Sequence, residues 1–295
     1  MGALTTMNAA ATDDGVRLRE MNDADLAAAH SLSEALRWPH RLADWKQVFH
    51  HAEGVVAERD GAIIGTALRF RWGPQDATIG LVIVAPAQQG RRIGHRLMSA
   101  VLDGLDGCRV RLNATMDGRG LYERLGFTRV GELRQHQGIA QPAPLVALDS
   151  GWRLRPAGAS DAAALKALDT QACGMPRDAL LDELLAEAEF TVVLDDGGTV
   201  RGFALLRRFG RGHAIGPVVA PDEEGAKALI AHLAGTNAGR FTRIDIDLDS
   251  GLAEWLEAMG LLRVDAPVVM QRGPAAEPPT PGAPRGYAVV TQALG

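Results

Sequence analysis

The 295-residue chain contains an internal repeat, which constrains its fold more than any other feature. Four segments of the first half recur in the second half in the same order, displaced by 134 to 137 residues. Chance matches would not keep both order and spacing, so the repeat indicates two copies of one fold. The paired segments are VRLREMNDADLAAAHSL from Val16 with WRLRPAGASDAAALKAL from Trp152, residues 54–73 with 190–210, ATIGLVIVAP ending at Pro86 with HAIGPVVAP ending at Pro221, and LYERLGFTRV from Leu121 with WLEAMGLLRV from Trp255.

The repeat predicts the domain organisation. We expect residues 1–13 to form a flexible tail, residues 14–149 a first domain and residues 150–295 a second domain. The last strand of the second domain is expected over residues 287–294. It is reached through the proline-rich loop 274–284, whose composition is also compatible with disorder.

The order of elements within one repeat predicts an α/β fold. Strands and helices alternate, with an antiparallel start and a strand-loop-helix centre, which is typical of a mixed α+β sandwich whose mostly antiparallel sheet is flanked by helices. The expected elements are strand 17–20, a helix opened by Asp23, helix 42–50, a hairpin turning at Arg59-Asp60-Gly61, strand 79–85, helix 92–105, strand 109–114, a short helix around Tyr122 and two closing strands.

Composition excludes several classes of protein. A net charge of −5 gives no global attraction to nucleic acid or to acidic membranes. The longest apolar run, residues 79–87, is too short to span a bilayer. With only two cysteines and no basic-then-apolar segment at the start, we expect a cytoplasmic protein without disulfides.

The segment VIVAPAQQGRRIGHRLM, residues 82–98, has the features of a phosphate-binding turn. A buried strand ends at a proline, and a short turn leads to a helix N-terminus, which carries unpaired N–H groups and the positive end of the helix dipole. Gly90 and Gly94 allow a ligand to approach the backbone, and Arg91 and Arg92 add positive charge. The same glycines are also compatible with a simple strand-to-helix turn.

Together with Tyr122-Glu123-Arg124-Leu125-Gly126-Phe127, the turn Gln89-Gly90-Arg91-Arg92-Ile93-Gly94 resembles the GCN5-related N-acetyltransferases (GNAT family). Arg92 stands where the middle glycine of the family turn is usual, and a residue with helical φ and an exposed side chain would fit there. The resemblance implies two tandem GNAT-like domains and acetyl-CoA as co-substrate. It also implies that the turn's backbone holds the coenzyme A pyrophosphate, a role assigned to Gln89, Gly90, Arg91, Arg92, Ile93, Gly94 and His95.

The resemblance also implies the catalytic groups. Tyr122 occupies the position of the phenol that donates a proton to the departing thiolate, although a tyrosine packed on the core would have the same pattern. The oxyanion donor is expected to be a backbone N–H among Val82, Ile83 and Val84. Asn113 ends the fifth strand, where it would bind the pantetheine arm, orient a water or serve as an ordinary strand-end residue.

The acceptor site is expected between the first two helices, in LRWPHRLADW. This segment combines aromatic walls, a titratable base and a carboxylate, which suit a small-molecule or peptide amine. The alternative is that the tryptophans pack in the core and the histidine lies on the surface. The candidate residues are Trp38, His40, Asp44 and Trp45; His50 and His51 have no metal-ligand spacing, so no metal is expected.

The second copy lacks the residues of this chemistry. Leu229 aligns with Gly94 and Leu256 with Tyr122, while three carboxylates (Asp222, Glu223 and Glu224) stand at the cradle, where they would repel a pyrophosphate. Gly225 keeps the place of Gly90. We therefore expect the second half to be a scaffold or one wall of the acceptor cleft.

The sequence predicts an N-acetyltransferase that transfers an acyl group from acetyl-CoA to a primary amine, acting as a monomer or homodimer. Two other hypotheses are a CoA-binding sensor without turnover and a nucleotide-binding protein that uses the same turn. A sensor does not explain a retained Tyr122 beside the turn, since binding needs no acid, and a nucleotide-binding protein would be stabilised against heat by ATP or NAD but not by CoA. The identity of the acceptor amine does not follow from the sequence.

Overall fold

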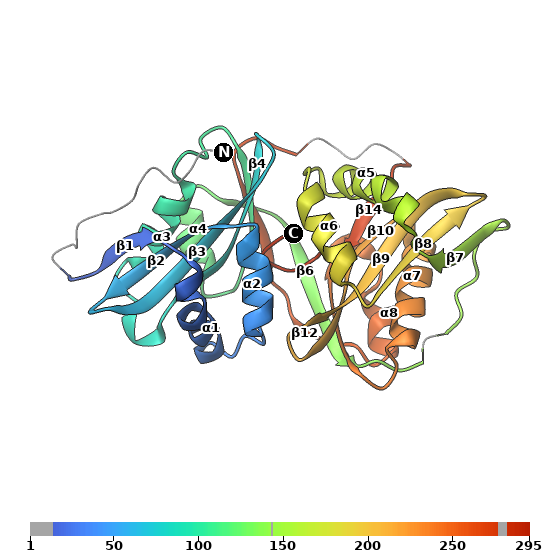
Figure 1. Cartoon of the computed structure of the whole chain (residues 1–295), viewed down its shortest axis with the longest axis horizontal. Coiled ribbons are helices and arrows are strands. Elements are labelled where there is room, and N and C mark those ends of the chain that lie inside the picture. Colours follow the sequence, from blue (N-terminus) through green and yellow to red (C-terminus); the bar gives the residue numbers. More distant parts are fainter. Residues whose placement is uncertain (1–13, 143, 277–281) are drawn as a thin grey trace.

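The computed structural model describes residues 14–142, 144–276 and 282–295. The chain forms two lobes side by side, and the long strand β6 runs from one lobe to the other (Figure 1). The elements of the first half are β1 (Arg17–Glu20), α1 (Leu26–Ala35), α2 (Leu42–His50), β2 (Glu53–Arg59), β3 (Ala62–Trp72), β4 (Asp76–Val84), α3 (Ile93–Leu102), β5 (Arg109–Ala114), α4 (Arg119–Arg124) and β6 (Thr128–Ile139).

The second half repeats this order up to its last strands. Its elements are β7 (Trp152–Pro156), α5 (Ala162–Cys173), α6 (Asp178–Glu187), β8 (Phe190–Asp196), β9 (Thr199–Phe209), β10 (Gly212–Ala220), α7 (Glu223–Thr236), β11 (Phe241–Asp247), α8 (Ala253–Ala258), β12 (Leu262–Asp265), β13 (Val268–Arg272) and β14 (Arg285–Ala288). Short 3₁₀ turns precede α1, α3, α5 and α8.

Local sequence explains several of these boundaries. Asn22 opens the first helical segment with a capping box, because its side chain accepts from Ala24 N–H while Asp25 accepts from the Asn22 N–H. The predicted hairpin is confirmed: Asp60 and Gly61 both have positive φ, as a two-residue turn between twisted strands requires. Helix α2 has its predicted bounds, whereas α3 is shorter than predicted, running from residue 93 to 102.

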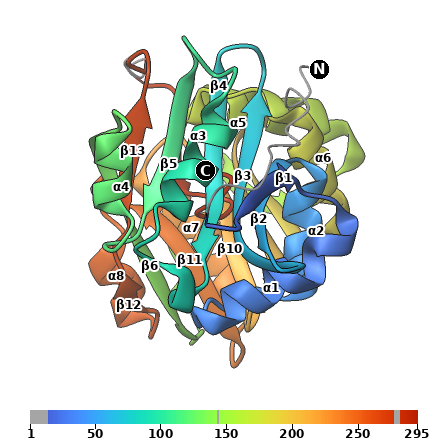
Figure 2. The same ribbon diagram turned by 90° about the vertical axis from the view of Figure 1, so that its left-hand side faces the viewer.

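The two halves exchange strands. In the first-half sheet, β13 of the second half lies between β5 and β6, antiparallel to both (Figure 2). Strand β6 pairs with β13 through its first part and with β11 of the second half through residues 133–139. The expectation of two closing strands in the first half is therefore wrong, since the first half contributes one strand and receives the other.

The predicted closing strand 287–294 is corrected to β14, Arg285–Ala288. The chain leaves the sheet after Ala288, because residues 291–295 close a turn in which Gly295 N–H bonds to the Thr291 carbonyl. Strand β14 lies between β10 and β11 and pairs with both. Of the proline-rich loop, residues 277–281 lie outside the described part of the chain.

The sheet separates three apolar cores. Helix α3 and the buried face of α4 cover one face of the first-half sheet, and α7 with α8 cover the corresponding face of the second half. The opposite faces, with α1, α2, α5 and α6, pack toward each other around a shared core that includes Trp45, Phe70, Leu180 and Phe203. The two halves thus turn their α1/α2-type faces inward and their α3-type faces outward.

The strand exchange predicts that the halves are not separable. A fragment of residues 14–149 lacks β13, so β5 and β6 would each lose a strand partner and expose a sheet edge. We expect this fragment to aggregate alone and to form a soluble one-to-one complex when mixed with residues 150–295, as measured by gel filtration and circular dichroism.

The matched control is the full chain cut at a protease site inserted within residues 144–149, which should stay together through gel filtration. A 14–149 fragment that is monomeric and unfolds cooperatively would contradict the prediction.

Candidate active site

The turn between β4 and α3 presents a row of free backbone donors. Helix α3 starts at Ile93, its first intrahelical bond is from Arg96 N–H to the Arg92 carbonyl, and no side chain caps it. Within the described residues, the N–H groups of residues 90–95 have no hydrogen-bond partner. Gly90 has φ +77° with open space where a Cβ would point, and the turn is exposed there. This arrangement can bind an anion.

Two residues of the turn differ from expectation. Arg92 has φ +60°, which is left-handed and not the right-handed helical value that we expected, so this position has the geometry that favours glycine. A Cβ at Gly94 would meet Leu121 Cδ2 of α4 at 3.3 Å. Gly94 therefore makes room for α4. Its contact with a ligand stays a prediction, as for the rest of residues 89–95.

Strand β4 diverges from β5 beside this turn. The two strands pair in parallel only from Asp76 to Ile79, and a bulge follows at Leu81, whose φ is +50°. The bulge reverses the alternation of side chains along β4. Before it, the odd-numbered Ile79 packs in the α3-side core. After it, the even-numbered Val82 and Val84 pack there, while Ile83 faces the shared core. Among the described residues, no strand pairs with residues 80–84 on the side that faces β5, which is the region expected for the oxyanion donor.

Tyr122 lies on α4, in the α3-side core against which Val82 and Val84 also pack. Its side chain is 8% exposed, its ring packs edge-on to Phe127 at 6.1 Å, and burial raises its pKa to about 12. The phenol is therefore protonated at neutral pH. Since Leu121 contacts Gly94, α4 packs directly on the first turn of α3, which brings the phenol and the turn into one region.

Asn113 is a strand residue of β5 and does not lie in a turn. It follows Leu112, the last residue of β5 that pairs with β4, so it stands where the two strands diverge. Its Nδ2 donates to the Gln292 carbonyl at 2.8 Å, and its buried Oδ1 has no partner within the described residues.

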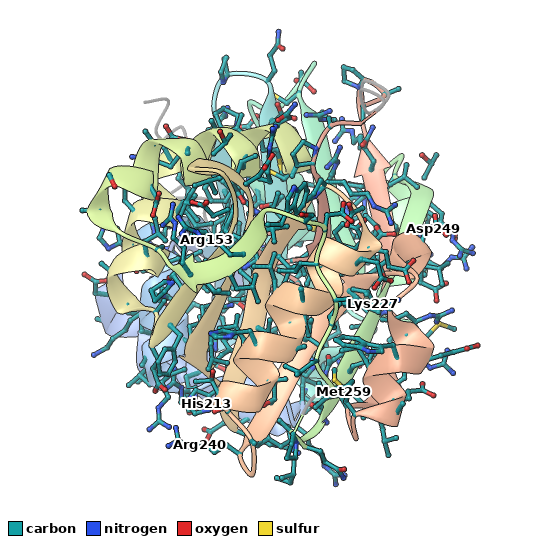
Figure 3. The ribbon with its side chains drawn as sticks, turned by 90° about the vertical axis from the view of Figure 1, so that its right-hand side faces the viewer. Arg153, His213, Lys227, Arg240, Asp249 and Met259 are labelled. Atoms are coloured by element: carbon teal, nitrogen blue, oxygen red, sulfur yellow. The ribbon has the colours of Figure 1, made fainter. Side chains whose placement is uncertain are left out.

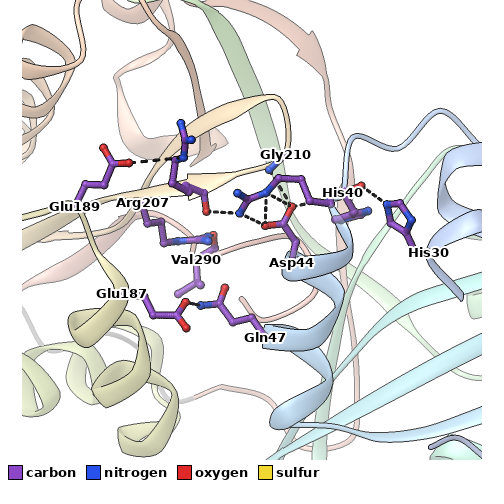
Figure 4. Close-up of polar contacts among 11 residues, drawn as sticks. His30, His40, Asp44, Gln47, Glu187, Glu189, Arg207, Gly210 and Val290 are labelled. Atoms are coloured by element: carbon purple, nitrogen blue, oxygen red, sulfur yellow. Dashed lines mark hydrogen bonds and ion pairs between the residues drawn. The ribbon is translucent and has the colours of Figure 1, made fainter. Parts of the chain in front are cut away.

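The four predicted acceptor residues lie at the interface between the halves. Asp44 is 2% exposed and accepts from the N–H and guanidinium of Arg41 and from the Gly210 N–H of the second half, at 2.9 Å (Figure 4). Trp45 is 1% exposed and donates to Ser33 Oγ, so it offers no surface to an acceptor. Their contacts are those of packing residues.

Trp38 and His40 make edge contacts in the same interface. The His40 ring packs against Trp38 at 6.0 Å and against Phe209 of the second half at 5.7 Å. Burial, followed by the nearby Arg243 charge, lowers the pKa of His40 to about 4. The imidazole is therefore neutral at physiological pH. An acceptor-binding role for these residues stays a prediction.

No metal site accompanies these residues. His51 is paired with Glu183 of α6 at 2.7 Å, and no cluster of three metal-ligating side chains occurs in the part of the chain that the structure describes.

The second half has no equivalent of the turn. Helix α7 begins at Glu223, two residues after Pro221, so the segment that aligns with the turn is helical and Gly225 lies within the helix. Asp222 caps it by accepting from Gly225 N–H at 2.7 Å, and Lys227 pairs with both glutamates of the first turn (Figure 3). Leu229 and Leu256 are buried in the core.

Strand β14 also closes the second half. It occupies the divergence between β10 and β11 that corresponds to the free edge between β4 and β5. A last strand was predicted after the proline-rich loop, but its position between β10 and β11 was not, because a short strand carries no sign of its partners.

The comparisons with known proteins agree with this geometry. Two family models, both described as acetyltransferase (GNAT) domain, match residues 20–141 and 165–281. The uncharacterized N-acetyltransferase YitH of Bacillus subtilis (strain 168) is 31% identical over 241 residues, covering 80% of this chain and 82% of YitH. The N-alpha-acetyltransferase RimI of Mycobacterium tuberculosis H37Rv is 32% identical over 109 residues, covering 35% of this chain and 69% of RimI.

Solved structures support the fold. A putative acetyltransferase from Pyrococcus horikoshii superposes with a TM-score of 0.78 at 20% identity, covering 96% of this chain and 97% of the other. A tandem GNAT protein from the clavulanic acid biosynthesis pathway superposes with a TM-score of 0.64 at 12% identity, covering 88% and 100%.

The family models and the relatives thus identify an acyltransferase with two GNAT domains in tandem. The chain belongs to the GNAT family of acyl-CoA N-acyltransferases. None of the helices in the described residues is long and apolar enough to cross a membrane.

The lowered pKa of His40 predicts a pH-dependent stability. The unfolded histidine gains a proton near pH 6.5 and the folded one only near pH 4, so the free energy of unfolding should fall as pH falls through this window. Between pH 7 and pH 4.5, the free energy of unfolding should decrease by about 2 kcal/mol less in His40→Phe than in the wild type, as measured by urea unfolding. Equal pH dependence in both proteins would contradict the burial of a neutral imidazole.

Proposed function

We propose that the chain transfers an acetyl group from acetyl-CoA to a primary amine, with its active site in the first half. The observation that carries the proposal is the set of N–H groups of residues 90–95 without a partner among the described residues, at a turn that packs against Val84 of β4 and against α4, the helix that carries Tyr122. Only one half combines these features, and in the other half the corresponding helix is capped and the corresponding edge is paired.

The turn is suited to the pyrophosphate of coenzyme A. Its amides and the dipole of α3 favour a negative group, and Gly90 leaves the approach open. The exposed cations Arg91 and Arg92 strengthen this attraction. Gln89 stabilises the turn, since its Nε2 donates to the Val84 carbonyl at 3.2 Å. We assign residues 89–95 to cofactor binding on these grounds.

The reaction requires an oxyanion donor and a proton donor from the protein. The free amine attacks the thioester carbonyl, a C–N bond forms, and the developing oxyanion accepts from a backbone N–H among Val82, Ile83 and Val84. When the C–S bond breaks, Tyr122 donates its proton to the leaving thiolate, and the proton that the amine nitrogen loses passes to water, from which the phenolate is protonated again. Its raised pKa keeps the phenol protonated at neutral pH, which is the state from which it can donate. Asn113 Oδ1 is available to an N–H of a bound reactant.

The similarity to RimI makes a peptide α-amine one candidate acceptor. The similarity covers only 35% of this chain, so small-molecule amines remain equal candidates.

Tyr122→Phe tests the proton donor. The ring keeps its packing against Phe127 while the hydroxyl is lost, so we expect kcat to fall by roughly 10²- to 10⁴-fold with little change in the KM of acetyl-CoA. The measurement is thiol release during acetylation of a panel of amines. Near-normal turnover would remove Tyr122 from the mechanism, and CoA binding without turnover of any amine by the wild type would favour a sensor.

The second test counts cofactor sites. Titration calorimetry of CoA with the full chain should give about one equivalent per chain, because Asp222 and the paired glutamates occupy the N-terminus of α7, the corresponding helix of the second half.

A charge-reversal variant tests where this site lies. Arg91→Glu should weaken CoA binding by about tenfold or more at low salt, whereas the exposed Arg211→Glu should not. Two equivalents of CoA, or equal effects of both variants, would contradict a single site in the first half.

A further inference from the structure

A large cleft lies between the two halves, on the face of the first-half sheet opposite α3. Its volume is about 1130 Å³, and both halves line it. Strand β5 alternates across the sheet: Val110, Leu112 and Ala114 point into the α3-side core, so Arg111 and Asn113 point the other way, into the cleft.

Arg111 is an unneutralised cation in this cleft. Its Nε donates to Gln271 Oε1 at 3.2 Å and its Nη1 to the Cys173 carbonyl at 3.3 Å, and Nη2 has no partner within the described residues. No carboxylate of those residues pairs with it, although burial lowers the pKa of the guanidinium and so makes its charge costly. The nearby Asp76 and Asp169 are paired with Arg109 and Arg177.

The repeat supplies an internal comparison. The parallel strand pairing aligns Arg111 with Arg243, and Asn113 with Asp245. In the second half, the guanidinium of Arg243 donates two hydrogen bonds to Asp245, at 2.9 and 2.7 Å, and both side chains are buried. In the first half an amide replaces that carboxylate, so the arginine keeps its charge and a free donor where a ligand can reach them.

Asn113 points to the same ligand. Its buried Oδ1 has no partner within the described residues, and a buried carbonyl oxygen without a donor destabilises the fold unless a ligand or water supplies one. Alternate residues of a strand are about 7 Å apart, which suits two polar groups of one small molecule. Asn113 also lies where β4 and β5 diverge, the region in which residues 82–84 of β4 are proposed to bind the thioester carbonyl.

Resting on the proposed function, we propose that the inter-half cleft binds the acceptor and that the acceptor is an amine carrying a carboxylate. Arg111 binds the carboxylate through its free guanidinium donor, and Asn113 Oδ1 accepts from the amine N–H and orients its lone pair toward the thioester. The second half supplies the opposite wall through α5 and the segment 289–295.

The test uses primary amines in pairs that differ only in the carboxylate: free amino acids and dipeptides against their C-terminal amides, with acetyl-CoA as donor. In at least one pair we expect kcat/KM of the free acid to exceed that of the amide by on the order of tenfold. Arg111→Gln should bring the two within about twofold by raising the KM of the acid, and Arg111→Lys should keep part of the preference.

The matched control is Arg153→Gln, an exposed arginine of β7 far from the cleft, which should keep the preference (Figure 3). Three outcomes would overturn the proposal: equal use of acids and amides by the wild type, an unchanged preference in Arg111→Gln, or acetylation of O-phosphoethanolamine without acetylation of any carboxylate-bearing amine.

A failure of the proposed function is distinguishable from these outcomes. If calorimetry detects no acetyl-CoA binding, the transferase assignment fails. The carboxylate site is then tested by titrating the same acids and amides into wild type and Arg111→Gln without donor. Acids that bind no better than amides, or equally to both proteins, would overturn it.

Discussion

The insertion of β13 between β5 and β6 is the contact on which the rest of the structure depends. Its residues pair with β5 from Val110 to Ala114 and with the first part of β6, so a strand of the second half completes the first-half sheet. The exchange fixes the orientation of the halves, and this orientation turns the polar face of β5 toward α5. Without it, Arg111 would face solvent, where a guanidinium binds anions only weakly.

Local structure was predictable because its causes are local. The turn at Asp60-Gly61, helix 42–50 and strand 109–114 follow from turn chemistry and periodicity, and the structure confirms them. Strand partners were not predictable, because β13 and β14 are short, and their hydrogen bonds do not depend on which half supplies the partner. A repeat suggests two separate copies, and nothing in its pattern distinguishes them from an exchanged pair.

The same division applies to the site. Residues 89–95 could be proposed from sequence, because glycines, arginines and a helix start produce an anion site wherever they occur. The segment from Trp38 to Trp45 has the composition of a binding site, but two faces of the molecule meet there, and aromatic residues serve a core equally well. Arg111 was missed because an arginine in a strand is common. The signal was present in the repeat, as RLN beside RID.

The differences between the halves have one physical pattern. In the second half the groups that correspond to the open ones of the first half have partners within the chain: Asp222 caps α7, Asp245 neutralises Arg243, and β14 pairs with β10 and β11. In the first half the equivalent groups are left open at the Gly90 turn, at Arg111 and along β4. Open polar groups lower the stability of a fold unless a ligand completes them. The second half therefore stabilises the fold. The first half keeps its unsatisfied groups on both sides of the divergence between β4 and β5, where the proposed acetyl-CoA and the proposed amine acceptor can come into contact.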